Sequence, residues 1–164
     1  MSTTAQAVKP EKTFFGQPRQ LTTIFGVEMW ERFSFYGMQG ILLLYMFYPV
    51  AKGGLGIDVK VATGIVGAYG GGVYLATILG AWLADRLFGS ERVLFYAAVM
   101  VMFGHIALAV LPAYAGLTVG LILIAIGAGG VKANATSIVG QLYAPGDVRR
   151  DAGFSLYYLG INLG

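Results

Sequence analysis

The sequence contains no cysteine and only one histidine among its 164 residues. Without cysteine, the chain cannot form a disulfide framework, a thiolate zinc site or a cysteine nucleophile. A single histidine cannot build an all-histidine metal site, and no serine–histidine arrangement typical of a hydrolase is present. We therefore expect no metal, no cofactor and no enzymatic activity.

Charged residues are also scarce, at 12% of the chain, which is about half the share usual in soluble domains. Hydrophobic residues make up 57%, and the mean hydropathy is +0.70. These values predict an integral membrane protein whose main surroundings are lipid. The net charge of +3 does not change this, because the basic residues form no patch on a polar surface. We expect no nucleic-acid partner.

Apolar stretches of the length that crosses a bilayer, about 20 residues, recur along the chain. They cover residues 21–50, 61–87, 93–111, 117–143 and 152–164, after a polar tail of residues 1–20. The last stretch has 13 residues, too few to cross about 30 Å of hydrocarbon at about 1.5 Å per residue. The sequence therefore predicts an all-α membrane protein truncated within its fifth transmembrane helix.

Basic residues predict the orientation of these spans. One side of the membrane receives seven of them, namely Lys9, Lys12, Arg19, Arg86, Arg92, Arg149 and Arg150, and the other receives only Lys52 and Lys60. Because positive charge marks the cytoplasmic side, we expect a multi-pass protein of the cytoplasmic membrane with a cytoplasmic N-terminus. Two pairs of small residues, Gly67 with Gly71 and Gly116 with Gly120, predict close helix packing.

The first apolar stretch contains three charges within five residues, Glu28, Glu31 and Arg32. Their spacing of i, i+3 and i+4 places them on one face of a helix, and Tyr36 continues this row. Each charge at mid-bilayer costs about 2.5–3.5 kcal/mol on insertion scales. Glu28 can pair with Arg32, and Glu31 then needs another partner or a proton.

Lys132 is the other ionisable group that lies far from the end of a span. We expect Lys132 to face Glu28 or Glu31 across a water-filled cavity. Such intramembrane charges usually mark an ion or substrate path, although a structural salt bridge is the alternative. His105 is interpreted as a packing residue, with a proton relay as the alternative, and Tyr69 and Tyr74 fit either a cavity wall or a helix interface.

Four stretches resemble known motifs. "ExxERFSFYG" at residues 28–37 resembles the first-helix motif of the proton-dependent oligopeptide transporter family, a branch of the major facilitator superfamily. "GAWLADRLFGSER" at 80–92 resembles the loop motif of that superfamily. "GAGGVKANATSIVGQLY" at 127–143 is similar to the fourth helix of the family, and "FSLYYLGINLG" at 154–164 to its fifth-helix signature, with Tyr157 and Asn162 in place.

The resemblance implies two six-helix bundles that bind substrate between them and carry di- and tripeptides together with protons by alternating access. This chain would supply part of the N-terminal bundle, and the missing C-terminal half would be its partner. The resemblance implies proton-coupling roles for Glu28, Glu31, Arg32 and Lys132, and substrate-binding roles for Arg32, Tyr36, Tyr74, Lys132 and Asn162. In the loop motif, Asp85, Arg86 and Arg92 are expected to hold the inward gate shut, with plain marking of the membrane topology by Arg86 and Arg92 as the alternative.

Three positions depart from the pattern of the family: Phe35 replaces a frequent tyrosine, Gln39 a frequent arginine, and Ala133 a frequent proline. The first two could change substrate preference. Two alternatives stay open. One is a carrier of another substrate, such as nitrate, although Glu28 and Glu31 argue against it. The other is a non-transporting membrane fragment that packs against a partner.

Overall fold

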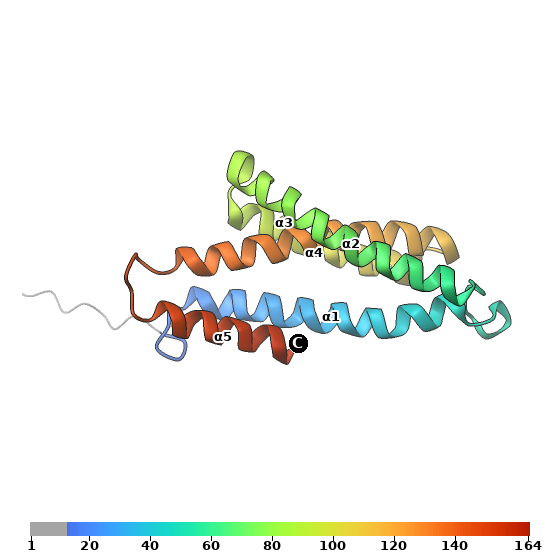
Figure 1. The fold of residues 1–164 in the computed structure, drawn as a ribbon, viewed down its shortest axis with the longest axis horizontal. Helices are drawn as coiled ribbons and strands as arrows, with labels where there is room; N and C mark the ends of the chain where they lie inside the picture. Colours follow the sequence, from blue (N-terminus) through green and yellow to red (C-terminus); the bar gives the residue numbers. More distant parts are fainter. Residues whose placement is uncertain (1–12) are drawn as a thin grey trace, which may run out of the picture.

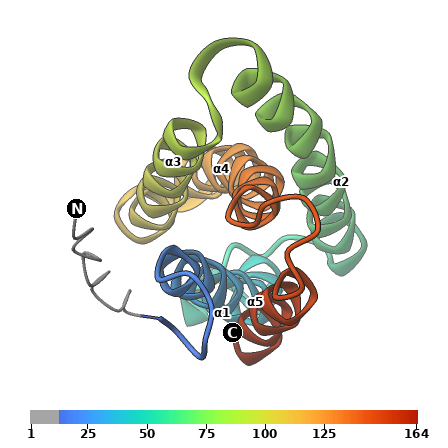
Figure 2. The ribbon, with the colours of Figure 1, turned by 90° about the vertical axis from the view of Figure 1, so that its left-hand side faces the viewer.

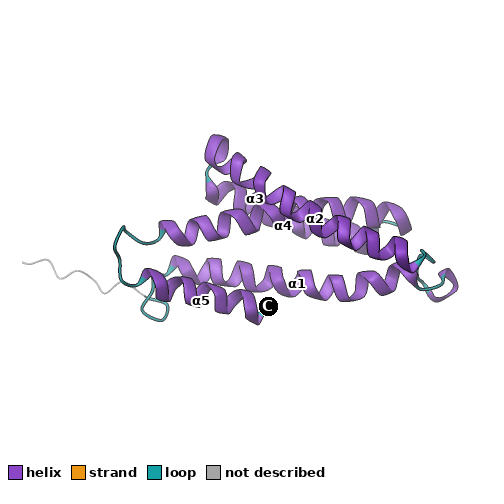
Figure 3. Cartoon of the chain, viewed as in Figure 1, coloured by secondary structure: helices purple, strands orange, loops and turns teal. Residues whose placement is uncertain are grey.

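The computed structural model describes residues 13–164, which form α-helices joined by short connections (Figure 3). The helices are α1 (Gln20–Phe47), α2 (Val59–Leu83), α3 (Ser90–Val110), α4 (Ala113–Gln141) and α5 (Arg150–Leu163). A 3-10 turn, η1 (Val50–Lys52), follows α1, and a π-helical turn, η2 (Ala84–Phe88), extends α2. Lys9 and Lys12 of the predicted basic tail lie outside the described residues.

The helices form two groups (Figure 1). Seen along the bundle, α4 lies between α3 and α2, while α1 and α5 lie side by side opposite α4 (Figure 2). The most extensive packing is of α4 against α3 and then against α2, followed by that of α5 against α1. The central position of α4 explains why most of its small residues are buried.

Local sequence signals set the helix ends. Tyr48, which precedes Pro49, is extended and ends α1, as expected for a residue before proline. Asp58 caps α2 by accepting a hydrogen bond from the backbone nitrogen of Lys60 at 2.8 Å. Pro112 precedes α4, where its missing N–H costs no helical hydrogen bond. The helices therefore match the predicted stretches to within a few residues.

Length and composition identify three helices of the described chain that can cross a membrane: α2 together with η2, α3 and α4. The first helix has 28 residues and is about 42 Å long, which also suffices. Three charges within five residues in its middle distinguish α1 from these three helices, of which α4 carries the single charge of Lys132. The predicted cytoplasmic N-terminus stays a prediction.

Glycines bring α4 close to two neighbours. A Cβ atom placed on Gly80 of α2 would lie 2.7 Å from the Cα atom of Gly130 on α4. A Cβ atom placed on Gly120 would likewise lie too close to Gly104 and Leu108 of α3. This confirms the close helix packing predicted for the pair Gly116 and Gly120.

The prediction is wrong for Gly67 and Gly71 within the described part of the chain. Both glycines are exposed, and a Cβ atom at either would meet no other atom within 4 Å. The spacing of small residues therefore indicates where helices can approach, and the packing of α4 decides where they do.

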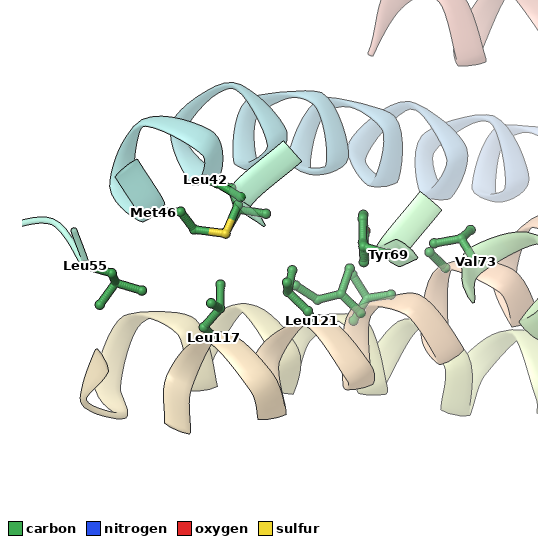
Figure 4. Packing of buried hydrophobic residues seen from close by; sticks show 11 residues of the cluster. Leu42, Met46, Leu55, Tyr69, Val73, Leu117 and Leu121 are labelled. Carbon is green, nitrogen blue, oxygen red and sulfur yellow. The ribbon is translucent and has the colours of Figure 1, made fainter. Parts of the chain in front are cut away.

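Two apolar clusters form the core. The first apolar cluster joins the second half of α1 with α2, α4, one residue of α3 and one residue of the connection before α2, and Figure 4 shows its packing. Its members are Leu42, Met46, Leu55, Ala62, Tyr69, Val73, Val101, Leu117, Leu121, Ile124 and Ala128. The second apolar cluster joins the start of α1 with α3, α4 and α5: Leu21, Ile24, Leu94, Ala97, Val131, Ala135, Ile138, Val139, Tyr143 and Tyr157.

Candidate functional site

A charged layer separates the two apolar clusters. On α1, the second cluster ends at Ile24 and the first begins at Leu42, and the predicted charges lie between them. Glu28, Glu31 and Arg32 are only 3%, 8% and 8% exposed. Burial of three ionisable groups between apolar surfaces is costly unless each has a partner, so their contacts determine what the site can do.

Arg32 pairs with Glu31. Its Nε atom donates to Oε2 of Glu31 at 2.6 Å, and its Nη2 atom lies within ion-pair distance of the same oxygen. The expected pairing of Arg32 with Glu28 is therefore not the one formed. Adjacent helical residues point in different directions, but the long arginine side chain bends sideways to reach its neighbour.

Glu28 finds its partner on α5 instead. The buried hydroxyl of Tyr157 donates to Oε1 of Glu28 at 2.8 Å and lies 3.1 Å from Oγ1 of Thr136 on α4. Sequence reasoning assigned no contact to Tyr157. The signal was its place in the fifth-helix motif, but the spacing of a single helix cannot show a contact that joins α1 to α5.

Two buried polar atoms near the charged residues of α1 have no hydrogen-bond partner among residues 13–164: Nη2 of Arg32 and the hydroxyl of Tyr69. The Arg32 guanidinium lies 4.9 Å from the ring centroid of Phe35, which stacks on Tyr69 at 5.9 Å. Buried donors are rarely left unpaired unless they serve a ligand or water. The Tyr69 hydroxyl thus offers hydrogen-bonding capacity against an aromatic wall, and Nη2 of Arg32 can add to it when its ion pair with Glu31 opens.

Lys132 points to an aromatic ring. Its Nζ atom lies 4.8 Å from the ring centroid of Tyr74 on α2, a cation–π distance. The two ion pairs found among residues 13–164 are Arg32–Glu31 and Arg149–Asp147, so Lys132 forms no ion pair with a glutamate there. That Lys132 faces Glu28 or Glu31 across a water-filled cavity stays a prediction. Lys132 still lies near enough to act electrostatically on Glu28 and Glu31.

The remaining predicted substrate residues are exposed. Tyr36 and Tyr74 are 58% and 67% exposed, and Asn162 is also exposed while its Nδ2 atom donates to the carbonyl of Tyr158 at 2.7 Å. Tyr36 lies one helical turn after Arg32 on α1. The structure therefore brings Arg32, Tyr36, Lys132 and Tyr74 to the charged layer, and it leaves Asn162 bonded to its own helix.

The predicted gating residues lie at the turn between α2 and α3. Asp85 and Arg86 belong to η2, and Arg92 lies in the first turn of α3. All three are exposed, and neither ion pair of the described chain includes them. Their gating role stays a prediction.

His105 joins α3 to α1. Its Nδ1 atom lies 2.8 Å from the carbonyl of Val101, so Nδ1 carries a hydrogen, and in the neutral ring Nε2 accepts from the Ser34 hydroxyl at 3.1 Å. His105, Ser34 and Glu31 line one cavity of about 660 Å³ between α1 and α3. These contacts suit the packing interpretation, and the proton relay stays an alternative.

Comparison with known proteins shows what the chain is similar to. The model of the POT family matches residues 91–164. The di-/tripeptide transporter of Lactococcus lactis subsp. lactis (strain IL1403) is 48% identical over 95% of this chain and 32% of its own length. The uncharacterized transporter YclF of Bacillus subtilis (strain 168) is 50% identical over 94% of this chain and 32% of its own length.

A crystal structure of the peptide transporter POT in complex with sulfate superposes with a TM-score of 0.90 and 54% sequence identity. The match covers 94% of this chain and 31% of that transporter. The chain belongs to the POT family. It therefore has the all-helical fold of that branch of the major facilitator superfamily, and it spans about a third of the length of the POT relatives it matches.

Proposed function

We propose that this chain forms part of a proton-coupled symporter of di- and tripeptides that works by alternating access in the cytoplasmic membrane. The observation that carries the proposal is the buried layer of Glu28, Glu31 and Arg32 beside Lys132 in a POT family chain. Intramembrane ionisable groups of this kind mark ion and substrate paths. A relative that is named a di-/tripeptide transporter supports the substrate class.

The Arg32–Glu31 pair suggests how a proton could be linked to a peptide. A proton on Glu31 cancels the charge that holds Arg32, and it frees the Nε and Nη2 atoms, which both lie against Oε2 of Glu31. A freed guanidinium can bind the C-terminal carboxylate of a peptide with two parallel hydrogen bonds. Release of the proton restores the ion pair and expels the carboxylate.

Lys132 has a complementary part. Because its ammonium lies over the Tyr74 ring, it can meet a substrate carboxylate without first breaking an ion pair. The exposed hydroxyls of Tyr36 and Tyr74 and the amide of Asn162 can bind the peptide backbone. The acid for the peptide N-terminus belongs to the missing half. The exposed Asp85, Arg86 and Arg92 are assigned to closure of the inward gate.

The transmembrane potential, worth about 2.3 kcal/mol per charge per 100 mV, and the pH gradient would drive the cycle. The test uses the full-length transporter in proteoliposomes with an inward proton gradient and a labelled dipeptide. We expect accumulation that collapses when a protonophore removes the gradient.

The variant Glu31→Gln should lose gradient-driven accumulation, because a neutral amide cannot release and take up the proton. Glu91→Gln is the matched control, since Glu91 is an exposed carboxylate in the first turn of α3. Accumulation that ignores the gradient, or that survives in Glu31→Gln, would contradict the coupling.

A further inference from the structure

The Tyr157 hydroxyl is a buried polar group that the proposed cycle does not yet use. Tyr157 is 1% exposed, and its oxygen lies 2.8 Å from Oε1 of Glu28 and 3.1 Å from Oγ1 of Thr136. The three residues lie on α5, α1 and α4. One hydroxyl therefore joins the three helices at the level of the charged layer.

The direction of these bonds follows from the chemistry of the groups. An ionised carboxylate only accepts hydrogen bonds, so Tyr157 donates to Glu28 and accepts from Thr136. A protonated carboxyl group can donate to Tyr157, whose hydrogen can then turn toward Thr136. The Thr136 hydroxyl can in turn donate to the carbonyl of Lys132, which lies 3.3 Å away. The chain of hydroxyls can thus reverse while its heavy atoms stay in place.

The surroundings of Glu28 differ from those of Glu31. Glu31 has a guanidinium partner, whereas the one hydrogen bond found for Glu28 in the described chain comes from a neutral phenol. The charged groups that act on Glu28 are Arg32 on its own helix and Lys132 on α4. The same two cations, and Glu28 itself, also act on Glu31. Tyr157 is the group that faces Glu28 from α5. Without it, Glu28 would be free to compete with Glu31 for Arg32.

We propose that Tyr157 is a positioning residue for proton coupling, which holds the Glu28 carboxyl toward α5 in both its charged and neutral forms, with Thr136 completing a reversible hydroxyl chain. This inference rests on the proposed proton-coupled function. It assigns Arg32 to Glu31 alone, because Tyr157 keeps the other carboxylate engaged. The two glutamates of the motif then have separate partners and separate tasks.

The test measures the pH dependence of gradient-driven dipeptide uptake by the full-length transporter, together with counterflow, the exchange of peptide without a proton gradient. Tyr157→Phe keeps the ring and removes the donor to the carboxylate. The charged form of Glu28 loses stabilisation, so less acid is needed to protonate it. We expect the midpoint of uptake to move up by about one pH unit, the effect of one hydrogen bond to a charged group. Counterflow should stay within about twofold, since the binding residues are intact.

Thr136→Val should shift the midpoint in the same direction by less, and Thr136→Ser should restore the wild-type profile because it keeps the hydroxyl. Tyr143→Phe is the matched control. Tyr143 is also buried, and its hydroxyl donates to Oε1 of Gln17 at 3.1 Å, away from the charged layer. Its pH profile should equal that of the wild type.

The outcomes separate the two proposals. A wild-type transporter that accumulates no dipeptide overturns the proposed function. A wild-type transporter that accumulates dipeptide, with an unshifted midpoint in Tyr157→Phe, overturns only the role of Tyr157. Loss of both uptake and counterflow in folded Tyr157→Phe protein would show a structural role for Tyr157 and overturn its positioning role. An equal shift of the midpoint in Tyr143→Phe would overturn it as well. If Tyr157→Phe does not fold, an unshifted Thr136→Val profile is the overturning result.

Discussion

At the scale of single residues, each charged side chain of the charged layer has a different partner. Arg32 bonds to Glu31, Tyr157 bonds to Glu28, and Lys132 lies over Tyr74. Each buried charge thereby receives a compensating group, as its low exposure requires. Only the Arg32–Glu31 pair combines opposite full charges, so it is the contact that a proton can break most directly.

The loop between α4 and α5 allows a prediction for a single carboxyl group outside the membrane. Asp147 accepts hydrogen bonds from the side chain of Arg149, at 2.8 and 3.1 Å, and from its backbone nitrogen at 2.9 Å. The side-chain bonds, followed by the backbone bond, lower the pKa of Asp147 below its usual value. The contact is therefore fully present above the usual aspartate pKa, and it is lost as the pH falls through the lowered value.

The pKa of Asp147 can be measured by carbon-13 carboxyl titration of the full-length protein in detergent, with Asp147→Asn to assign the signal. We expect a midpoint below that of an unpaired aspartate. Arg149→Gln should return it toward the usual value, because the charged side-chain donors are removed. An unchanged midpoint in Arg149→Gln would show that the backbone nitrogen alone sets it.

At the scale of helices, the close approach of α2 and α4 depends on glycine. The Cβ atom of Gly80→Ala would lie 2.7 Å from the backbone of Gly130, so the helices would have to separate. Overpacking of this kind costs about 1–3 kcal/mol. We expect a lower thermal unfolding midpoint for full-length Gly80→Ala protein in detergent.

Gly64→Ala provides the control, because Gly64 lies on the same helix, is exposed and has no neighbouring atom within 4 Å of an added Cβ. Its midpoint should be equal or slightly higher, since alanine favours helix by about 1 kcal/mol over glycine. Equal stability of the two variants would contradict close packing at Gly80.

The helices themselves follow largely from the sequence. Apolar length predicts all five, and prolines and caps place their ends, so that the predicted 93–111 corresponds to Ser90–Val110. The π-helical turn η2 was not predicted. This turn ends at Gly89, whose φ of +79° starts the turn into α3. Hydropathy reports which residues are apolar, and it does not predict a local change in backbone conformation.

At the scale of the molecule, the chain spans about a third of the length of its relatives, and it exposes Tyr36, Tyr74 and Asn162, three of the side chains that it would offer to a peptide. A symporter that binds substrate between two bundles needs both of them. We therefore expect the 164-residue chain alone to accumulate no dipeptide in proteoliposomes.

Co-expression of the chain with the remaining two thirds of the transporter should restore gradient-driven uptake. The co-expressed piece must lack the helices of the 164-residue chain, so that restored uptake requires the two pieces to assemble. Uptake by the 164-residue chain alone would contradict the need for a second bundle.

The sequence by itself determined the membrane class, the helices and the face that carries Glu28, Glu31 and Arg32, because hydropathy, helical period and capping are local properties. It also supplied the motifs on which membership of the POT family was predicted. Only the tertiary structure decided that Arg32 bonds to Glu31, that Glu28 bonds to Tyr157, and that Lys132 turns to Tyr74. These choices depend on which helices become neighbours, and the spacing along one helix does not contain that information.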